Sequence, residues 1–261
     1  MDCKQIGFQI KDRLATIILD DKESANALSE DVISELAAVL ERCEFDDAVG
    51  AVLIRGANNT FCSGGNIRAM QQQAQTGSYS RLALGRLGDA AMRLKNMSKP
   101  TICAIEGACA GAGMSLAMAC DFSIAREDAK FTFAFINLAL VPDMGGTALL
   151  VKSAGVNKAK ELMLGGGVFL GTEAAQWGII TKAVPADRFE EQVEKTCQKL
   201  LATAPVAYSR IKTMINRCAF PGFDAGLQNE MEYQYASYFS KDHVEGVNAF
   251  LEKRRPKFGN Q

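Results

Sequence analysis

The chain has 261 residues, enough for one large domain or a main domain with an appendage. Its composition, 48% hydrophobic and 23% charged, is that of an ordinary globular protein. The net charge is -1, and Lys and Arg are spread along the chain, which argues against general nucleic-acid binding. The N-terminus does not resemble a secretory signal, and no apolar run is long enough to span a bilayer. We therefore expect a cytoplasmic protein without a membrane partner.

The first half of the chain alternates short apolar strands with helical segments. Strands are predicted at 8–10 and 15–19, as a hairpin, and then at 51–54, 101–105 and 122–125. A helix is predicted over 29–43, because apolar residues recur there at helical spacing and Ser29 suits an N-cap. Strands joined by helices form right-handed crossover units, so the pattern predicts an α/β protein with a largely parallel sheet.

From about Asp187 the predicted elements are helices only. Four amphipathic segments follow one another, at 190–201, 205–217, 223–238 and 242–253. Four consecutive helices cannot all cover the preceding sheet. Their large apolar side chains therefore need burial elsewhere, and a neighbouring subunit is the natural candidate. These side chains are Met231, Tyr233, Tyr235, Tyr238, Phe239 and Phe250.

The cysteines and the histidine form no metal-binding or nucleophile pattern. The eight cysteines include no CxxC pair and stand mostly among apolar or small neighbours, so we interpret them as buried hydrophobes in a reducing compartment. The single histidine, His243, has no Cys or Asp at ligand spacing. We therefore expect neither a metal site nor a Ser-His-Asp triad.

Two glycine-rich segments stand at predicted strand-to-helix junctions, at 61–67 (FCSGGNI) and 107–115 (GACAGAGMS). Their small side chains allow backbone N–H groups to approach a ligand closely. Two such donors that meet at one carbonyl oxygen would stabilise an enolate. Neither segment is a Walker A loop or a convincing dinucleotide fingerprint. Either segment alone is a weak signal, because a glycine-rich turn more often serves the close packing of a helix on a sheet than chemistry.

Six blocks of the chain resemble the crotonase family, also called the enoyl-CoA hydratase/isomerase superfamily. They are the 24–28 segment (SANAL), FCSGGNI, 99–107, the AGAGMSLAMACD block, 131–147 and the tail 240–254. The blocks follow the family's order and cover nearly the whole chain. The resemblance implies a spiral core of repeated ββα units over residues 1–195. It also implies a C-terminal helical region over 196–261 that builds a homotrimer or a dimer of trimers.

The resemblance implies an acyl-CoA thioester as substrate, without a further cofactor or a metal. It assigns the two oxyanion-hole N–H groups to Gly65 and Ala112. The family usually has Gly at the second position, and a backbone donor tolerates Ala there if φ is negative. The residues expected to contact CoA or substrate are Ala25, Ser63, Gly64, Asn66, Ile67, Ser115 and Phe135. Lys257 is the basic residue expected to reach the CoA phosphate of a neighbouring subunit.

The chain departs from the family's hydratases at two positions. Hydration needs a base that activates water and an acid that protonates carbon, and these hydratases use two glutamates. Ser115 and Phe135 stand at the matching positions, so the sequence argues against a standard hydratase. Ser115 could hold a water or shape the acyl pocket, or it could serve only as a small residue in helix packing.

One carboxylate remains at a suitable place, Asp143 in the LVPDMGGT loop. This loop resembles the one in which the family's isomerases carry an acidic residue. One base can move a proton from Cα to Cγ, so the resemblance favours a 3-enoyl to 2-enoyl isomerase. Burial among Phe135, Leu138 and Met144 would raise the pKa of Asp143. Alternatively, Asp143 caps the following helix, which would lower its pKa.

Other functions remain open on this sequence. Decarboxylation of a malonyl-type thioester, carried by CoA or a carrier protein, needs the oxyanion hole but no strong base. A weak hydratase and a non-catalytic acyl-CoA-binding subunit are further alternatives. Among the remaining polar residues, Asp121 fits a structural role with backbone partners, Glu106 fits a surface or ion-paired role, and Asn66 is expected to order its loop.

Overall fold

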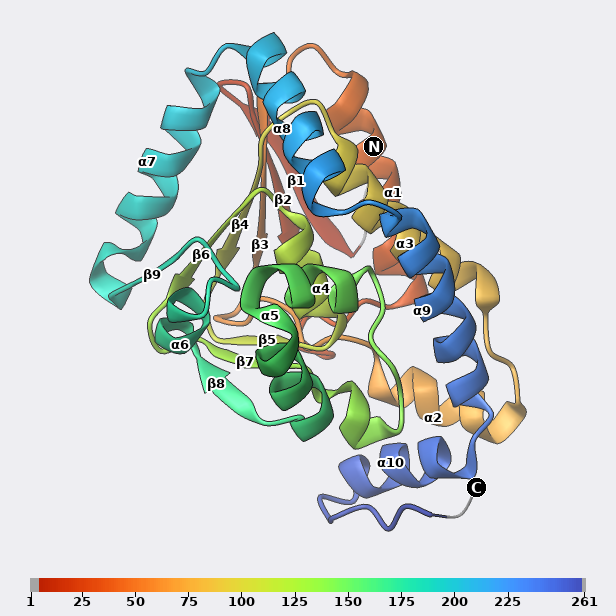
Figure 1. The fold of residues 1–261 in the computed structure, drawn as a ribbon. Helices are drawn as coiled ribbons and strands as arrows, with labels where there is room; N and C mark the ends of the chain where they lie inside the picture. Colours follow the sequence, from red (N-terminus) through yellow and green to blue (C-terminus); the bar gives the residue numbers. More distant parts are fainter. Residues whose placement is uncertain (1–4, 260–261) are drawn as a thin grey trace.

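The computed structural model describes residues 5–259, in which strands and helices alternate through the first half (Figure 1). The predicted hairpin is confirmed, since β1 (Ile6–Lys11) pairs antiparallel with β2 (Leu14–Leu19). Every further pairing in this sheet is parallel, and the strands that make it are β3 (Ala51–Gly56), β4 (Thr101–Ile105), β6 (Phe122–Arg126) and β9 (Lys182–Val184). The sheet has the order β1-β2-β3-β4-β6-β9, which confirms the α/β class.

A second, three-stranded sheet carries the second glycine-rich segment. It has the order β5-β7-β8 and consists of β5 (Ala108–Ala110), β7 (Lys130–Thr132) and β8 (Val168–Leu170). The chain passes from β4 into β5 through Gly107, whose φ is +65°. A Cβ at Gly107 would overlap the carbonyl oxygen of Asn59, so the turn between the two sheets requires glycine. This passage brings the 107–115 segment next to the 61–67 segment.

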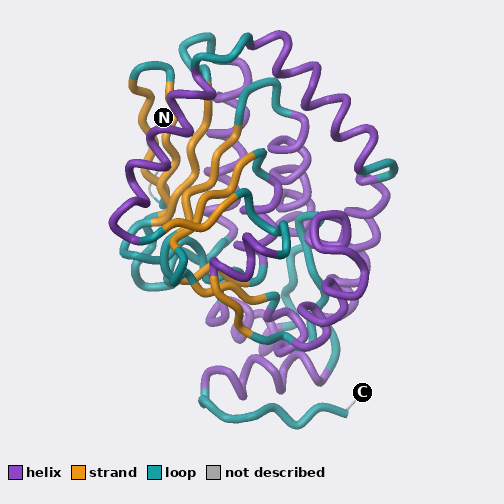
Figure 2. The backbone as a smooth tube through the Cα atoms, turned by 60° about the vertical axis from the view of Figure 1, so that its left-hand side comes forward, coloured by secondary structure: helices purple, strands orange, loops and turns teal. Residues whose placement is uncertain are grey.

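Helices pack on both faces of the large sheet, as Figure 2 shows. Side chains alternate along a strand. Ala51 and Leu53 of β3 therefore pack in the core under α7 (Phe189–Leu201), while Val52 and Ile54 belong to the main core. That main core also contains buried residues of α1 (Glu30–Phe45), α3 (Arg81–Asn96) and α4 (Ala112–Ala119). The predicted cap of α1 is present, since the Ser29 side chain accepts the N–H of Val32 at 3.3 Å.

The helices after β9 begin and end close to the predicted positions. They are α7, α8 (Pro205–Ala219), α9 (Phe223–Tyr238) and α10 (Lys241–Leu251). The expectation that their large apolar residues need another subunit is wrong in part. Met231, Tyr235 and Tyr238 pack against the main core of their own chain, whereas Tyr233, Phe239 and Phe250 are exposed. The reason is that α9 packs along α3 and α10 packs on α2 (Ile67–Thr76).

The expected boundary between the core and the C-terminal region, at 195/196, falls inside α7, which is one continuous helix (Phe189–Leu201).

The cysteines at 43, 62, 103, 109, 120 and 197 are buried, as expected, whereas Cys218 is exposed and Cys3 lies outside the described residues. His243 is also buried, and its Nδ1 lies 2.9 Å from the carbonyl oxygen of Leu138. Within residues 5–259 no helix is long and apolar enough to cross a membrane.

Candidate active site

The two glycine-rich segments lie side by side and are bonded to each other. The N–H groups of Phe61 and Cys62 donate to the carbonyl of Ala108 at 2.9 and 3.1 Å. In return, the N–H of Ala110 donates to the carbonyl of Cys62 at 2.9 Å. Two segments far apart in the sequence thus form one continuous backbone surface.

The 24–28 segment holds this surface from the other side. The N–H of Ser63 donates to the carbonyl of Ala25 at 3.1 Å, and both Ala25 and Asn26 adopt left-handed backbone conformations. Asn26 is almost fully buried, and its side-chain amide donates to the carbonyls of Ala57 and Thr60 at 3.0 and 2.7 Å. Asparagine tolerates the left-handed region and can bond backbone locally, which accounts for its place in this turn.

Gly65 and Ala112 present backbone N–H groups beside this junction. Ala112 is the first residue of α4 and has no positive φ, so its N–H lies among those without an acceptor inside the helix. The N–H of Gly65 donates no hydrogen bond to any described residue. The two residues lie close together. A Cβ built on Gly64, the neighbour of Gly65 in the chain, would lie only 3.5 Å from the Ala112 nitrogen. The structure therefore brings together the two predicted donors, with the negative φ that Ala112 requires.

A cavity of about 670 Å³ opens beside these donors and is referred to here as the main cavity. That volume lies within the roughly 300–1,000 Å³ usual for ligand sites. Most of the predicted site residues line it, namely Ala25, Ser63, Gly64, Gly65, Asn66, Ile67, Ala112, Phe135 and Asp143. Phe250 and Leu251 of α10 complete the lining, which the sequence did not indicate. The C-terminal helix therefore forms part of the cavity of its own chain.

Asp143 is the buried carboxyl in the main cavity. The residue is 8% exposed, and its Oδ1 has no hydrogen-bond partner among the described residues. Burial raises the pKa of Asp143 to about 8, and the nearby charge of Glu230 acts in the same direction. The predicted apolar surroundings are present, since Phe135 and Met144 are buried and Leu138 lines the same cavity.

The alternative in which Asp143 caps the following helix is wrong. The N-cap of α5 (Gly146–Gly165) is Gly145, and no side chain of the N-cap residue bonds the helix. Glu230 of α9 bonds the helix end instead. Its carboxylate accepts the N–H of Gly145 at 2.7 Å and that of Thr147 at 2.8 Å. With these donors occupied, the Asp143 side chain accepts none of the N–H groups at this helix end among the described residues.

Glu230 is the residue that sequence reasoning missed. It lies within an amphipathic helix, and no local pattern links it to the loop that carries Asp143. Burial raises the pKa of Glu230, while the hydrogen bonds that it accepts from Thr147 and Gly145 oppose that rise. Only the packing of α9 onto the rest of the chain brings the two carboxyls near each other.

A family model described as enoyl-CoA hydratase/isomerase matches residues 9–261. The chain belongs to the enoyl-CoA hydratase/isomerase family. Trans-2-decenoyl-acyl-carrier-protein isomerase of Streptococcus mutans is 30% identical over 260 residues, covering 99% of each chain. 1,2-epoxyphenylacetyl-CoA isomerase of Escherichia coli is 34% identical over 246 residues, covering 93% of this chain and 94% of the relative. A solved enoyl-CoA hydratase from Mycobacterium avium subsp. paratuberculosis has a TM-score of 0.91 at 30% identity, covering 99% of this chain and 100% of its own.

Membership of the enoyl-CoA hydratase/isomerase family confirms the resemblance and the crotonase fold. An acyl-CoA thioester is the substrate expected for this family. The names of the relatives include both hydratases and isomerases, so the family alone does not select the reaction.

Ser115 is not among the residues that line the main cavity of this enoyl-CoA hydratase/isomerase. It is fully buried in α4, and its Oγ has no hydrogen-bond partner within residues 5–259. A Cβ on Gly146 would overlap this Oγ, so α4 and α5 meet closely here. Ser115 therefore does not contact the main cavity as predicted. It has the other role considered for it, that of a small residue that allows two helices to pack closely.

Three polar residues have the predicted structural roles. Asp121 accepts the backbone N–H of Thr101 at 3.0 Å. Glu106 forms an ion pair with Arg55 at 3.3 Å. Asn66 caps α2, where its Oδ1 accepts a first-turn N–H at 3.0 Å. Each of these side chains has a structural bond, and Asn66 additionally lines the main cavity.

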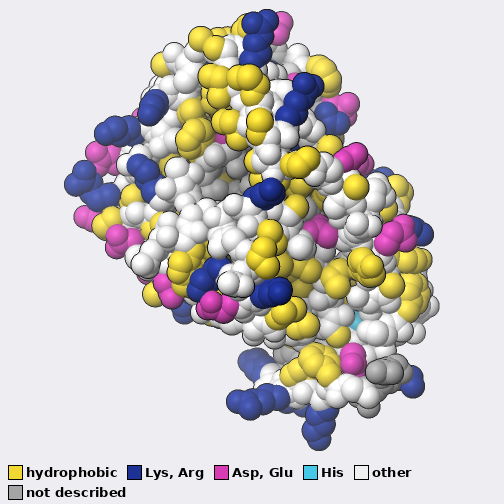
Figure 3. Space-filling model, in the orientation of Figure 1, with side chains coloured by type: hydrophobic (Ala, Val, Ile, Leu, Met, Phe, Trp, Pro, Cys, Tyr) yellow, Lys and Arg dark blue, Asp and Glu magenta, His cyan; other side chains and the backbone are white. Residues whose placement is uncertain are grey.

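Lys257 follows α10 in a basic stretch. Figure 3 shows Lys and Arg side chains gathered on α10 and the chain after it, at the bottom of the view. The backbone N–H of Lys257 donates to Glu245 at 2.8 Å, which fixes the course of the chain there. Its contact with the CoA phosphate of another subunit stays a prediction. No cluster of His, Cys, Asp and Glu in the described part of the chain is suited to a metal ion.

Proposed function

We propose that this enzyme moves the double bond of an acyl-CoA from position 3 to position 2 by one-base proton transfer. The observation that carries the proposal is the buried Asp143 carboxyl, which lines the same cavity as Gly65 and Ala112 and whose Oδ1 has no hydrogen-bond partner in the described part of the chain. A base and two backbone donors are the groups that this reaction needs. Two relatives named as isomerases support the choice.

The reaction proceeds in two proton transfers. The Asp143 carboxylate removes a proton from Cα, and the electron pair moves into the thioester to give a dienolate. The N–H groups of Gly65 and Ala112 donate to its oxyanion, where negative charge has developed. The protonated Asp143 then delivers a proton to Cγ, the thioester carbonyl re-forms, and the double bond stands between Cα and Cβ. No co-reactant is consumed.

The other acidic side chains at the main cavity are less suited to this role. Asp21 lines it near the 24–28 segment, but its Oδ1 accepts the N–H groups of Glu23 and Ser24 at 3.1 and 3.2 Å. Glu23 also lines the cavity, and its residue is exposed to solvent. Phe135 takes the place where a hydratase would carry an acid, and this favours isomerisation over hydration.

Substitution Asp143→Asn tests the proposal. The amide keeps the size of the side chain but cannot take the Cα proton. We expect the isomerisation of trans-3-hexenoyl-CoA to fall about 10²–10⁴-fold, as on loss of a general base. Binding of a saturated acyl-CoA should persist. The matched control is Glu23→Gln, a carboxyl-to-amide change in the same cavity, which should stay within a few-fold of the wild type. An unchanged rate in Asp143→Asn would remove Asp143 as the base.

Two outcomes separate the alternatives. If Asp143→Asn and the wild type both decarboxylate a malonyl thioester at the same rate, the enzyme uses the oxyanion hole for decarboxylation. If the wild type turns over no enoyl or malonyl thioester but still binds acyl-CoA, the chain is a binding subunit.

We also propose that the protein is a homotrimer or a dimer of trimers. Apolar side chains remain exposed along α8, which supports a further contact surface there; they are Val206, Ile211, Met214 and Ile215. Light scattering after size-exclusion chromatography measures the mass directly. A monomeric mass at micromolar concentration would contradict this proposal.

A further inference from the structure

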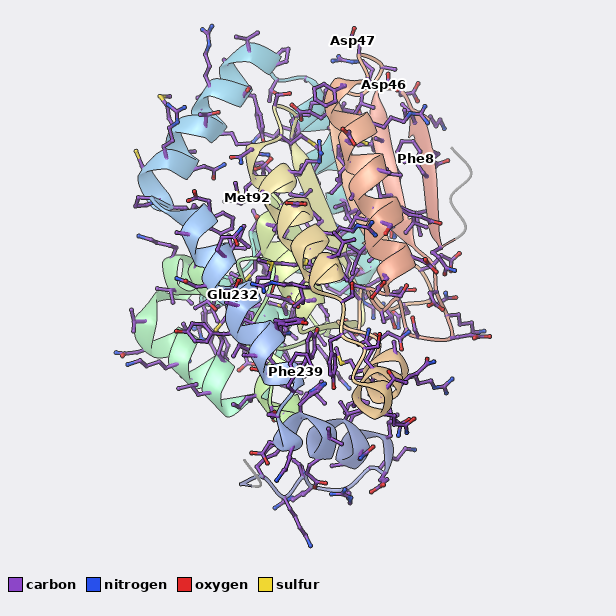
Figure 4. The ribbon with its side chains drawn as sticks, turned by 90° about the vertical axis from the view of Figure 1, so that its right-hand side faces the viewer. Phe8, Asp46, Asp47, Met92, Glu232 and Phe239 are labelled. Atoms are coloured by element: carbon purple, nitrogen blue, oxygen red, sulfur yellow. The ribbon has the colours of Figure 1, made fainter. Side chains whose placement is uncertain are left out.

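A second cavity lies on another side of Asp143. Its volume is about 300 Å³, and it is lined by residues of α3 and α9 together with Asp143 and Met144. Figure 4 faces these two helices and labels Met92 of α3, which is one of the lining residues. Asp143 and Met144 are buried, whereas Asp89 and Asp224 in the same lining are exposed. The cavity therefore connects the protein surface with the buried carboxyl.

Asp143 is the only residue in the described part of the chain that lines both this second cavity and the main cavity. Its Oδ1 is buried and has no hydrogen-bond partner among residues 5–259, although a buried carboxyl oxygen without a partner is costly. The carboxyl thus stands where the two cavities meet.

The lining of the second cavity combines carboxyl groups with apolar side chains, and the large apolar residues are Leu84, Met92, Met144, Leu227 and Met231. Asp89, Asp224 and Glu230 contribute carboxyl groups to this lining, and no Lys or Arg lines the cavity within residues 5–259. Carboxyl groups hold water and relay protons, whereas burying them against an apolar acyl chain would cost desolvation energy. The cavity also has the volume to hold several waters, since each occupies about 30 Å³ in the liquid.

We propose that the cavity between α3 and α9 is the route by which the Asp143 carboxyl exchanges its proton with solvent while the substrate fills the main cavity. The inference rests on the proposed isomerase function. The carboxyl takes a proton from Cα, passes it to water in the second cavity, and receives another from the same water. No net charge or atom is gained, but the proton delivered to Cγ then comes from solvent. Without this route, the proton taken from Cα would return to Cγ of the same molecule.

Gly88 offers a way to fill the second cavity without touching the main one. Gly85 and Gly88 both line it from α3, and a Cβ on either would meet no atom within 4 Å. Gly88→Leu should therefore place its side chain in the cavity without a clash. Gly85→Leu, one helical turn away, is a second variant with the same purpose. Gly226→Leu is the matched control, because Gly226 lies in α9 with open space around it and does not line the cavity.

The experiment follows the isomerisation of trans-3-hexenoyl-CoA in D₂O, with deuterium at Cγ of the product measured by mass spectrometry. The wild type and Gly226→Leu should incorporate deuterium in most turnovers. Gly88→Leu and Gly85→Leu should incorporate several-fold less, while kcat stays within about threefold, because the proton transfers to substrate are intact. Circular dichroism melts would verify that each variant is folded.

Three results would overturn the inference: a wild-type product without deuterium, unchanged incorporation in both Leu variants, or a loss of turnover restricted to long acyl chains. The last result would assign the cavity to the acyl chain. Absence of isomerisation by the wild type would overturn the proposed function instead. In that case, exchange of the Cα hydrogens of the unreacted thioester, followed by NMR in D₂O, gives the same comparison between the variants.

Discussion

The main cavity has two walls that are built in different ways. The donor wall is formed by the backbone N–H groups of Gly65 and Ala112. These residues belong to two glycine-rich segments that are hydrogen bonded to each other through their backbones. The acid wall, formed by Asp143, uses a side chain whose protonation depends on burial and on Glu230 of α9. The donor wall should therefore respond to changes in backbone, and the acid wall to changes in charge. This difference can be tested on each wall separately.

After Asp143→Asn, the largest effect is expected from Gly65→Pro, which removes one donor of the donor wall. Loss of one oxyanion donor lowers kcat by about 10²–10³-fold. Gly65→Ala is the matched control, because it keeps the N–H and its Cβ would meet only the end of the flexible Met70 side chain. Steady-state kinetics with trans-3-hexenoyl-CoA measure both variants. Equal activity of the Pro and Ala variants would show that the Gly65 N–H is not a donor to the substrate.

The acid wall should make the reaction strongly dependent on pH. Burial raises the pKa of Asp143 to about 8, and the base must be ionised to take the Cα proton. Below that pH the ionised fraction, and with it kcat/KM, should rise about tenfold per pH unit and then level off. A profile of kcat/KM from pH 5.5 to 9.5 measures this. A rate that falls as pH rises through this range would instead mean that protonated Asp143 is the active form.

Glu230→Gln tests how far α9 controls the acid wall. Removing the charge of Glu230 lowers the pKa of Asp143, because that charge raises it in the wild type. The rise in kcat/KM should move to lower pH, with a gain on the order of a few-fold at pH 6. The amide also loses one acceptor at the end of α5, which should cost about 1 kcal/mol of stability.

The control for this variant is Glu232→Gln on the same helix. Glu232 is more than half exposed and pairs with Arg81 at the surface, on the side seen in Figure 4. Its pH profile should match that of the wild type. A profile of Glu230→Gln that also matches the wild type would mean that Glu230 only holds the helix end.

The smallest effect concerns stability. The folded state raises the pKa of Asp143 above its ordinary 3.8, so between those values the folded chain binds more protons than the unfolded chain. Stability from this group is therefore lost as pH rises through the window toward about 8. Asp143→Asn removes the cost, and Tm should rise by roughly 2–4 °C per kcal/mol recovered. Thermal melts at pH 5 and pH 8 should show a larger gain at pH 8, and equal gains would contradict this origin.

Much of the fold could be predicted because its elements carry local patterns. The helix predicted over 29–43 is Glu30–Phe45, and the strand predicted at 101–105 is Thr101–Ile105. The strands of the second sheet were not predicted, since each has only three residues and shows no periodicity. The helix α10 was predicted, but its packing on α2 of the same chain was not. Amphipathicity indicates that a helix buries one face, but not against which chain it does so.

The sequence by itself determined the donor wall, the crotonase fold and the position of the one suitable carboxyl. Backbone donors need only a local strand-to-helix geometry, and glycine-rich segments are visible in the residues themselves. Only the tertiary structure decided whether Asp143 caps a helix or stays an unbonded carboxyl in the cavity. Glu230, from a helix distant in the sequence, accepts the N–H groups that Asp143 would otherwise cap. It also places Ser115 in the packing of α4, outside the lining of the main cavity, and places a second cavity beside Asp143. The state of a buried carboxyl depends on every group packed around it, and most of those groups are distant in the sequence.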